Sequence, residues 1–458
     1  KDKADIVDVI SEHIVLKKKG KEFVGICPFH DDNKPSMTVS PAKQFYYCFS
    51  CGAGGNSIKF LMEFTRNNFS DVVLSLAKKN DINIRTIDGP QQEAFQKQLS
   101  KREELYKVLR ISKNWFKSQL TNSSGKLAQE YLIKNRNLSQ STIDDFEIGY
   151  APNSWTDLYD YLFKVEKFSK EVIFKAGLII SKQNENKTYD RFRNRIIVPI
   201  FDPQGRVVAF GGRSLDGSEP KYLNSPESEV FEKGKLLFAF HKASSNVRKL
   251  DRAIVVEGYF DVITLHSKGI NNAVASLGTA LSKYQISQLC RCTDNKNIII
   301  NFDSDNAGIS ATKRIISEVE SLSLTQQINL KILQLKGFKD PDEYLRRNSA
   351  DDFRNLIDTA SFWIDWEIDQ IFLNKDISKA EGFQSVVSSL VKFLSKLTLS
   401  STRTHYLQKV SERLSMGQAR LAIKFEEDLR KQVKGFRWHG RSQKFELPNE
   451  ISQKEKNE

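Results

Sequence analysis

The chain lacks the long apolar segment that a membrane-spanning helix needs, since none of its apolar runs reaches about eighteen residues. Its first residues, from Lys1 onward, are charged and do not form the apolar core of a secretory signal peptide. We therefore expect neither membrane insertion nor secretion, and we expect a cytoplasmic location. A starting Met is also absent, which indicates a processed chain or a fragment.

Two further patterns are missing. There is no Walker A motif, so the chain does not encode the phosphate-binding loop of an NTP-driven motor. We find no internal repeat.

Cysteine is scarce, with five in 458 residues, and disulfides are rare in cytosolic proteins. The length allows about three domains, and 39% hydrophobic with 28% charged residues is typical of a globular protein with a large core.

Acidic residues are fewer than basic residues. The chain has 70 Lys and Arg against 57 Asp and Glu, a formal net charge of +13. This surplus favours a polyanionic partner, because neutralising phosphates releases counterions. Solvated lysines that bind nothing explain such a surplus equally well. The position of the surplus is more informative, since residues 182–252 hold 14 Lys and Arg against 9 Asp and Glu.

Four potential metal ligands form one array in the first part of the chain: Cys27, His30, Cys48 and Cys51. Two short ligand pairs separated by a loop suit tetrahedral zinc, because each pair forms a tight knuckle and the loop brings the pairs together. Thiolate and imidazole ligands without an open position predict a structural ion. The alternatives are buried free cysteines beside a chance histidine, or a disulfide.

Acidic residues follow apolar segments at three places. Residues 252–256 form a short apolar strand that runs into Glu257, and residues 297–302 form another that runs into Asp303. Helical patterns follow both strands, which predicts a parallel sheet covered by helices. Ligands bind at the carboxyl ends of such strands, and magnesium prefers carboxylate and phosphate oxygens. The predicted magnesium site consists of three pairs: Glu257 with Asp261, Asp303 with Asp305, and Asp340 with Asp342.

Helix capping is the alternative for any one of these acids. Asp303 and Asp305 stand where a helix cap is expected, and Asp340 and Asp342 flank a proline in a pattern typical of helix entry. Three pairs within one alternating strand and helix segment are harder to explain by capping alone.

A basic run lies upstream of the acids. If residues 190–195 enter a strand, alternation places Arg191, Arg193 and Arg195 on one face. Arg213 follows two glycines that let the backbone approach a ligand, and Lys221 and Lys233 lie in loop-like segments. Phosphate or nucleotide binding is the prediction for Arg191, Arg193, Arg213, Lys221 and Lys233, and a solvated basic surface is the alternative.

These patterns predict a multidomain α/β protein. The expected parts are a zinc-ribbon-like domain, a linker, a basic mixed α+β subdomain, a parallel α/β subdomain with the acids, a helical bundle and a polar tail. Their ranges are 1–88, 89–105, 106–250, 251–346, 347–435 and 436–458, respectively.

The chain resembles the bacterial replicative DNA primases of the DnaG type. The motifs that carry the resemblance are Cys27-Pro-Phe-His30, Cys48-x-x-Cys51-Gly52, Asp190-Arg-Phe-Arg193, Phe210-Gly-Gly-Arg213, Pro220-Lys-Tyr-Leu-Asn-Ser-Pro226, Val256-Glu-Gly-Tyr-Phe-Asp261, Asp303-Ser-Asp305 and Asn306-Ala-Gly308. The α/β segment with its acids resembles the Toprim domain that topoisomerases and some nucleases share.

The resemblance implies a DNA-templated RNA polymerase that makes short primers in the nucleoid. By resemblance, Glu257 is the catalytic acid, Asp303, Asp305, Asp340 and Asp342 hold Mg²⁺ or Mn²⁺, and Arg136, Arg213, Lys221, Asn224 and Lys233 bind template or nucleotide. We expect metal ions held by Glu257, Asp303 and Asp305 to act on the 3′-hydroxyl and the α-phosphate. Phe45, Tyr46, Tyr47 and Phe49 are candidates for base stacking in the zinc domain, although at least half of such residues should instead pack its core.

The expected partners are single-stranded DNA template, ribonucleoside triphosphates, the RNA primer and a replicative helicase, and the protein is expected to be a monomer. The family's C-terminal helicase-binding domain is expected to be absent from this chain. Asn137 stands after Arg136 where the family often has glycine, and Ser50 and Glu232 also depart from the family pattern. Two other classes remain open: a Toprim nuclease or topoisomerase, and a non-catalytic protein that binds single strands.

Overall fold

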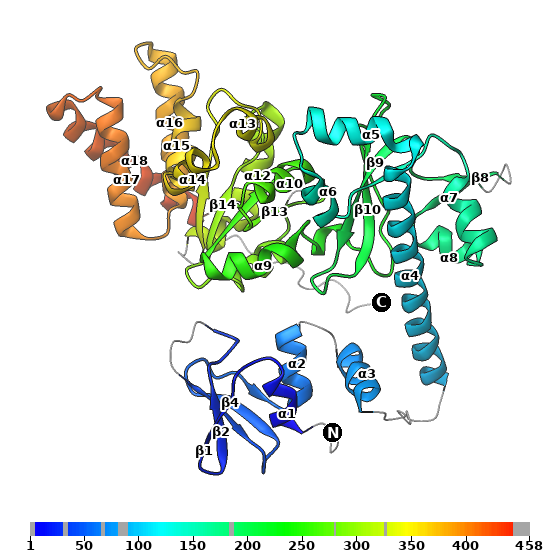
Figure 1. The fold of residues 1–458 in the computed structure, drawn as a ribbon. Helices are drawn as coiled ribbons and strands as arrows, with labels where there is room; N and C mark the ends of the chain where they lie inside the picture. Colours follow the sequence, from blue (N-terminus) through cyan, green and yellow to red (C-terminus); the bar gives the residue numbers. More distant parts are fainter. Residues whose placement is uncertain are drawn as a thin grey trace, which may run out of the picture. The chain divides into compact units, whose positions relative to one another are not determined.

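The structure is a computed structural model that describes residues 5–30, 35–65, 69–80, 90–182, 187–278, 281–324 and 328–442 (Figure 1). The chain divides into two compact units, Lys1–Glu232 and Lys233–Glu458, which are described separately.

The first unit begins with a small antiparallel sheet whose five strands follow one another in sequence order. The strands are β1 (Lys17–Lys19), β2 (Glu22–Gly25), β3 (Met37–Ser40), β4 (Phe45–Cys48) and β5 (Gly54–Gly55), and the helices are α1 (Ile6–Ser11), α2 (Ser57–Thr65) and α3 (Phe69–Lys79). Burial alternates along β4, so Tyr46 lies in the core while Phe45 and Tyr47 are exposed. Phe60 from α2 meets the Tyr46 ring edge-on at 5.4 Å, which closes this small core.

The rest of the first unit is built on the long helix α4 (Pro90–Thr121) and a sheet with strand order β11-β10-β9-β6. Leu109 and Phe116 of α4 pack against this sheet, with Phe116 and Phe210 in edge-on contact at 5.2 Å. α4 therefore runs through the segment that was expected to be a linker. The remaining elements are η1 (Ser123–Gly125), α5 (Lys126–Glu130), η2 (Tyr131–Asn135), α6 (Gln140–Asp145), β6 (Gly149–Ala151), α7 (Asp157–Asp160), η3 (Tyr161–Val165), α8 (Lys170–Lys175), β7 (Ile179–Lys182), β8 (Lys187–Asp190), β9 (Arg195–Phe201), β10 (Val207–Ser214) and β11 (Tyr222–Asn224).

Residues 131–148 and 161–178 have the same backbone course, so the expectation of no internal repeat is wrong. Each copy opens with a π-helical turn, η2 or η3. Each then turns through a residue of positive φ and starts a helix at a serine that caps it. The shared positions include tyrosine, leucine, lysine, serine and isoleucine: Tyr131 and Tyr161, Leu132 and Leu162, Lys134 and Lys164, Ser139 and Ser169, Ile143 and Ile173. So few identities hid the repeat, because equivalent hydrogen bonds rather than equal residues define it.

The second unit contains a mixed five-stranded sheet in the order β13-β12-β14-β15-β16. The pairs among β12 (Arg252–Val256), β13 (Ala273–Ala275), β14 (Asn297–Ile300) and β15 (Asn329–Ile332) are parallel, whereas β16 (Ser361–Phe362) is antiparallel. β12, β13 and β14 are almost wholly buried, as strands covered on both faces should be. β16 lies beyond residue 346, where the Toprim segment was expected to end.

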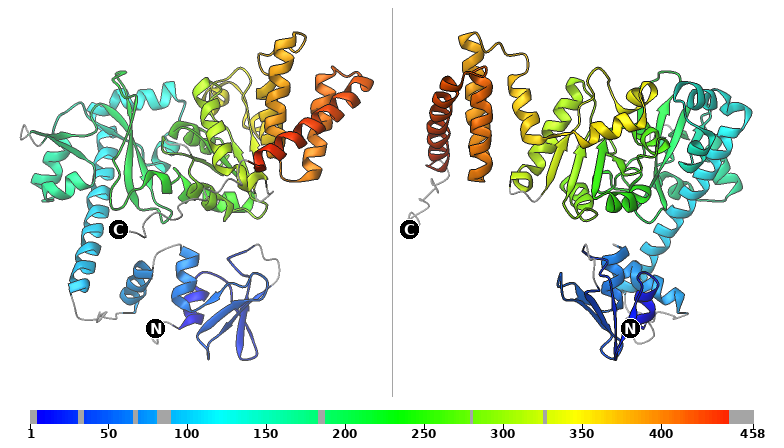
Figure 2. Two further views of the ribbon diagram at one scale, coloured as in Figure 1. Left: turned by 180° about the vertical axis from the view of Figure 1, so that it is seen from behind. Right: turned by 60° about the vertical axis from the view of Figure 1, so that its left-hand side comes forward.

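Helices connect these strands and continue past them (Figure 1). Those of the sheet are η4 (Lys233–Lys235), α9 (Phe240–Lys249), α10 (Tyr259–Ser267), α11 (Lys283–Cys290), α12 (Asn306–Leu324), α13 (Pro341–Arg347) and α14 (Ala350–Asp358). The later helices are α15 (Trp363–Phe372), α16 (Ala380–Lys396), α17 (Ser400–Leu414) and α18 (Ala419–Ser442). Figure 2 shows α16, α17 and α18 side by side, and their apolar faces join one core with Trp363 and the sheet.

The predicted fold class, with a zinc-ribbon-like domain, a mixed α+β part, a parallel α/β part and a helical bundle, is confirmed. The expected polar tail begins inside α18, and residues 443–458 lie outside the described residues. Within the described ranges, no helix is both long and apolar enough to cross a membrane.

Candidate functional sites

The four predicted zinc ligands come together in the small antiparallel sheet. The ligand atoms of Cys27, His30, Cys48 and Cys51 all lie within 4.8 Å of one another. The Sγ atoms of Cys27 and Cys51 are 3.8 Å apart, as are Cys48 Sγ and His30 Nδ1. Gly52 follows with φ of +74°, which lets the chain turn away directly after the second pair.

The surroundings of the cysteines affect their thiols differently. Burial raises the pKa of the Cys27 thiol above its ordinary range. Burial also acts to raise the pKa of Cys48, but hydrogen bonds from the Ser36 hydroxyl and from the backbone N–H groups of Cys51 and Ser50 outweigh it and lower that pKa to about 7. Thiolate is the form that binds metal, so Cys48 is prepared for it. Three thiols, two of them buried, and one imidazole fit a closed structural zinc site.

The predicted catalytic acids gather at the carboxyl ends of β12 and β14. Glu257 directly follows β12, and its Oε1 accepts a hydrogen bond of 3.2 Å from the backbone N–H of Asp303. Asp305 Oδ1 accepts from the backbone N–H of Gly308 at 2.9 Å and so caps α12. A Cβ on Gly308 would stand 2.1 Å from the Asp303 carbonyl oxygen, so only glycine allows this close turn.

Burial and neighbouring acids disfavour the ionised carboxylates at this site, whereas a lysine favours them. Burial raises the pKa of Glu257 to about 7, and repulsion from the nearby Asp303 carboxylate is the second cause of this rise. Burial also raises the pKa of Asp303, against the attraction of Lys339. Lys339 Nζ lies 3.5 Å from Asp303 Oδ2 and 3.8 Å from Asp305 Oδ2. Sequence reasoning missed Lys339, and its place directly before Asp340 was the only signal.

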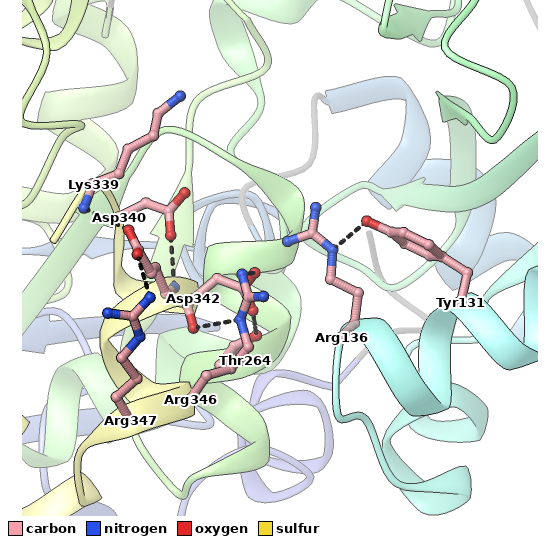
Figure 3. Close-up of polar contacts among 9 residues, drawn as sticks. Tyr131, Arg136, Thr264, Lys339, Asp340, Asp342, Arg346 and Arg347 are labelled. Atoms are coloured by element: carbon pink, nitrogen blue, oxygen red, sulfur yellow. Dashed lines mark hydrogen bonds and ion pairs between the residues drawn. The ribbon is translucent and has the colours of Figure 1, made fainter.

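The other acids of the predicted magnesium site have structural bonds, and Figure 3 shows the surroundings of two of them, Asp340 and Asp342. Asp342 is fully buried, and its carboxylate accepts from Thr264 Oγ1 at 2.7 Å and pairs with Arg346 at 2.8 Å. Asp340 caps α13 by accepting the backbone N–H of Glu343 at 2.7 Å. Asp261 is also buried and accepts the backbone N–H of Gly258 at 3.0 Å. Helix capping therefore accounts for one oxygen of Asp340 and of Asp261.

Glu257, Asp303 and Asp305 thus form the set with the chemistry of a divalent cation site: partly buried carboxylates whose mutual repulsion a cation would relieve. They are more widely spaced than the zinc ligands. In the part of the chain that the structure describes, no second group of three or more His, Cys, Asp or Glu has ligand atoms all within 4.8 Å of one another.

The arginines of the basic run have different surroundings from those predicted. Residues 191–194 lie between β8 and β9, so the expected alternation of Arg191, Arg193 and Arg195 on one strand face is wrong. Arg191 donates twice to the carbonyl oxygen of Asn224, at 2.9 and 3.2 Å, and buried Arg195 donates to that of Pro220 at 2.8 Å. Both guanidinium groups therefore hold the backbone of the loop and strand that contain Lys221 and Asn224.

Arg193 lies against aromatic rings. Its Cζ is 4.4 Å from the centroid of the Trp155 ring and 5.0 Å from that of Tyr189, and its Nη1 donates to the carbonyl oxygen of Asp190 at 2.5 Å. The remaining predicted binding residues, Arg136, Arg213 and Lys221, are at least partly accessible and lie in the first unit, whereas Lys233 begins η4 in the second. Asn137 has φ of +53°, the conformation that glycine adopts freely and asparagine tolerates.

Four family models match successive parts of the chain. The CHC2 zinc finger matches residues 1–92, the N-terminal domain of the DNA primase catalytic core matches 115–244, and the Toprim-like model matches 254–345. The DnaB-helicase binding domain of primase matches residues 364–419.

A zinc ribbon joined to a Toprim-like module with acids at its strand ends defines a class of multidomain Toprim proteins that carry a zinc finger. The chain belongs to the DnaG-type DNA primase family. It is 51% identical to the DNA primase of Synechococcus elongatus over all of this chain and 66% of that protein. It is 44% identical to that of Synechocystis sp. over 92% of this chain and 67% of that protein, so it spans about two thirds of their length.

Solved structures agree with this assignment. The zinc-binding and RNA polymerase domains of the Aquifex aeolicus primase match 90% of this chain and 95% of that chain, with 31% identity and a TM-score of 0.55. A DnaG primase catalytic domain bound to single-stranded DNA matches 69% of this chain and 98% of that chain, with 31% identity and a TM-score of 0.59.

The expectation that the helicase-binding domain is absent needs correction, because the matching residues 364–419 run from α15 to the start of α18. Buried Val386, Leu390 and Leu394 do form a bundle core, as their spacing predicted. An apolar core stripe reports only the inner face of a helix, so the spacing of these residues could not indicate a helicase-binding domain.

Proposed function

We propose that this protein is a nucleotidyltransferase that synthesises short RNA primers on a single-stranded DNA template. Membership of the DNA primase family supports the reaction class. The observation that carries the proposal is the grouping of Glu257 and Asp303 at the carboxyl ends of parallel strands, joined by a 3.2 Å hydrogen bond and with raised pKa values. No protein nucleophile is needed for such a transfer.

Glu257, Asp303 and Asp305 are the residues that would hold Mg²⁺ or Mn²⁺, with Asp340 as a further candidate at the same edge. A bound divalent cation supplies charge stabilisation at a transferring phosphate. Asp342 would support the metal-binding acids indirectly. Its buried carboxylate pairs with Arg346 and accepts a hydrogen bond from Thr264, so it fixes α13 against α10. Lys339 offsets the charge of Asp303 and Asp305.

Arg136, Arg213, Lys221, Asn224 and Lys233 are the proposed contacts for template or triphosphate. Arg191 and Arg195 support Lys221 and Asn224 indirectly, since their guanidinium groups fix the backbone at Asn224 and Pro220. Arg193 rests on Trp155 and Tyr189, so its proposed contact with template depends on the rings as well.

The zinc ribbon is the proposed reader of single-stranded template. Phe45, Tyr47 and Phe49 are its exposed aromatic residues among the four candidates, and the Tyr47 and Phe49 rings are 5.1 Å apart. Exposed rings can stack with bases, whereas buried Tyr46 packs the core. Helices within residues 364–419 are the proposed contact for a replicative helicase.

A primer-synthesis assay tests the function. The chain is incubated with single-stranded DNA, labelled ribonucleoside triphosphates and Mg²⁺, and the products are separated by length. We expect short RNA products that require both template and metal. Template cleavage without synthesis would instead identify a Toprim nuclease, and template binding without either reaction would identify a single-strand binding protein.

A further inference from the structure

One tyrosine contacts two of the proposed binding arginines. The Nε of Arg136 donates a hydrogen bond of 2.7 Å to the hydroxyl of Tyr131 (Figure 3). The Arg136 Cζ lies 5.6 Å from the centroid of the Tyr131 ring, and the Arg213 Cζ lies 4.3 Å from the same centroid. Tyr131 is thus shared by two guanidinium groups that come from separate elements, the end of η2 and the strand β10.

The π-helical turn explains why Tyr131 meets Arg136. In an α-helix the residues on one face are three or four positions apart, whereas a π-helical turn brings residues five positions apart together. Tyr131 opens this turn and Arg136 closes it, with the Arg136 backbone N–H donating to the Tyr131 carbonyl oxygen at 3.0 Å. The wider turn therefore places the tyrosine hydroxyl against the guanidinium.

Two like charges beside one ring need compensation. The face of an aromatic ring attracts guanidinium cations, and the hydroxyl oxygen accepts a further hydrogen bond from one of them. A phosphate group, which accepts paired N–H donors from arginine, matches such an arrangement.

The second copy of the repeat provides an internal comparison. Tyr161 and Glu166 occupy the positions of Tyr131 and Arg136, and the Tyr161 hydroxyl donates to Glu166 Oε1 at 2.8 Å. The Tyr161 ring stacks on Trp115 at 6.2 Å rather than on a guanidinium. The same scaffold is thus built twice with opposite charge, so the fold alone does not require arginine at this position.

We propose that Tyr131 is a positioning residue that holds Arg136 and Arg213 together as one phosphate-binding pair. The proposal rests on the primer-synthesis function above and adds a residue that sequence reasoning did not single out. The phosphate belongs either to the DNA template or to a ribonucleoside triphosphate, and the two arms of the test distinguish these sources.

Three variants of the whole chain test the proposal: Tyr131→Phe removes only the hydroxyl, Tyr131→Leu removes the hydroxyl and the ring, and Tyr161→Phe is the matched control in the second copy. Fluorescence anisotropy with a labelled oligothymidylate measures template affinity over a range of salt concentrations. Calorimetric titration with ATP measures triphosphate affinity. Thermal unfolding of each variant checks that the fold is retained.

We expect Tyr131→Phe to weaken binding about threefold and Tyr131→Leu about tenfold in one of the two arms, with Tyr161→Phe unchanged. If the template phosphate is the ligand, the slope of log affinity against log salt should also become about 0.7 shallower for Tyr131→Leu. A merely structural role would not move this slope. Combining Tyr131→Leu with Arg136→Ala should add little to the larger single effect, because both changes disrupt one unit.

Wild-type affinity and salt dependence in both Tyr131 variants, in both arms, would overturn the proposal while leaving the proposed function standing. An equal loss in Tyr161→Phe would overturn it too, because the effect would then come from the shared scaffold. If Tyr131→Leu unfolds, Tyr131→Phe alone decides between these outcomes. Absence of binding by the wild-type chain would remove the proposed function and this inference together.

Discussion

The zinc ribbon and the Toprim-like sheet each gather ligands for a cation, but they hold them differently. Cys27, Cys48 and their partners place all four ligand atoms within 4.8 Å, inside a core that contains Tyr46. The acids at β12 and β14 are spaced more widely, and Lys339 lies among them. A closed set makes an ion part of the fold, whereas an open set leaves coordination positions to a substrate.

Removing the zinc ligands should give the largest effect. We expect Cys48→Ser, or treatment with a chelator, to unfold the zinc ribbon, because binding of a structural zinc contributes about 10 kcal/mol to folding in small zinc domains. Metal analysis and limited proteolysis measure the loss, and Cys290→Ser, outside the cluster, is the control. Freshly purified wild-type protein without stoichiometric zinc would refute the zinc assignment.

Changing an acid of the open site should abolish the reaction and spare the fold. We expect Asp303→Asn to lower primer synthesis by about 10³-fold, a loss typical of removing a key electrostatic contact, while template affinity and thermal stability stay near wild type. Asp351→Asn, at an exposed acid paired with Arg354, is the control and should retain activity. Full activity in Asp303→Asn would remove that carboxylate from the proposed site.

The raised pKa of Glu257 predicts how stability depends on pH. Because its pKa is about 7 in the folded protein and near 4.5 when unfolded, the folded state binds the extra proton between these values. Metal-free protein should therefore lose about 1–2 kcal/mol as pH rises from about 4.5 to above 7, after allowance for solvent screening. Glu257→Gln should remove the part of the loss that comes from Glu257, whereas the part that comes from other buried acids should remain, and denaturant unfolding at several pH values measures the difference.

Asp190 supplies the control for that measurement. Burial raises its pKa to about 7 as well, although it accepts two backbone hydrogen bonds of 2.9 Å at Leu158 and Tyr159 rather than facing other site acids. Added Mg²⁺ should stabilise the protein at pH 8 in Asp190→Asn but not in Glu257→Gln. Equal stabilisation of both variants would mean that the ion binds elsewhere.

Lys339 should have the smallest effect. Its side chain is 56% exposed, so its attraction to Asp303 is partly screened. We expect Lys339→Met to tighten Mg²⁺ binding by about threefold, because the carboxylates would lose a competing positive charge. Calorimetric titration compares this variant with Lys336→Met in the same loop. Weaker binding in Lys339→Met would show that the lysine assists the ion instead of competing with it.

The sequence alone determined those features that short-range spacing encodes. The paired spacing of Cys27 with His30 and of Cys48 with Cys51 predicted the zinc cluster before any contact was known. The alternation of apolar strands and helices predicted that Glu257 and Asp303 meet at one edge, because parallel strands bring their carboxyl ends together. The sequence also indicated the helix-entry alternative for Asp340, because a proline follows it.

Only the tertiary structure decided which partners the other polar groups find. Arg191 bonds to the backbone at Asn224, Asp342 is buried against Thr264, and Tyr131 joins Arg136 to Arg213. Most of these partners are distant in sequence. Tyr131 and Arg136 are close in sequence, but they meet through a π-helical turn that the periodicity of the sequence did not predict. Charge and spacing can specify which residue types are available, but the choice among acceptors is made when the chain packs.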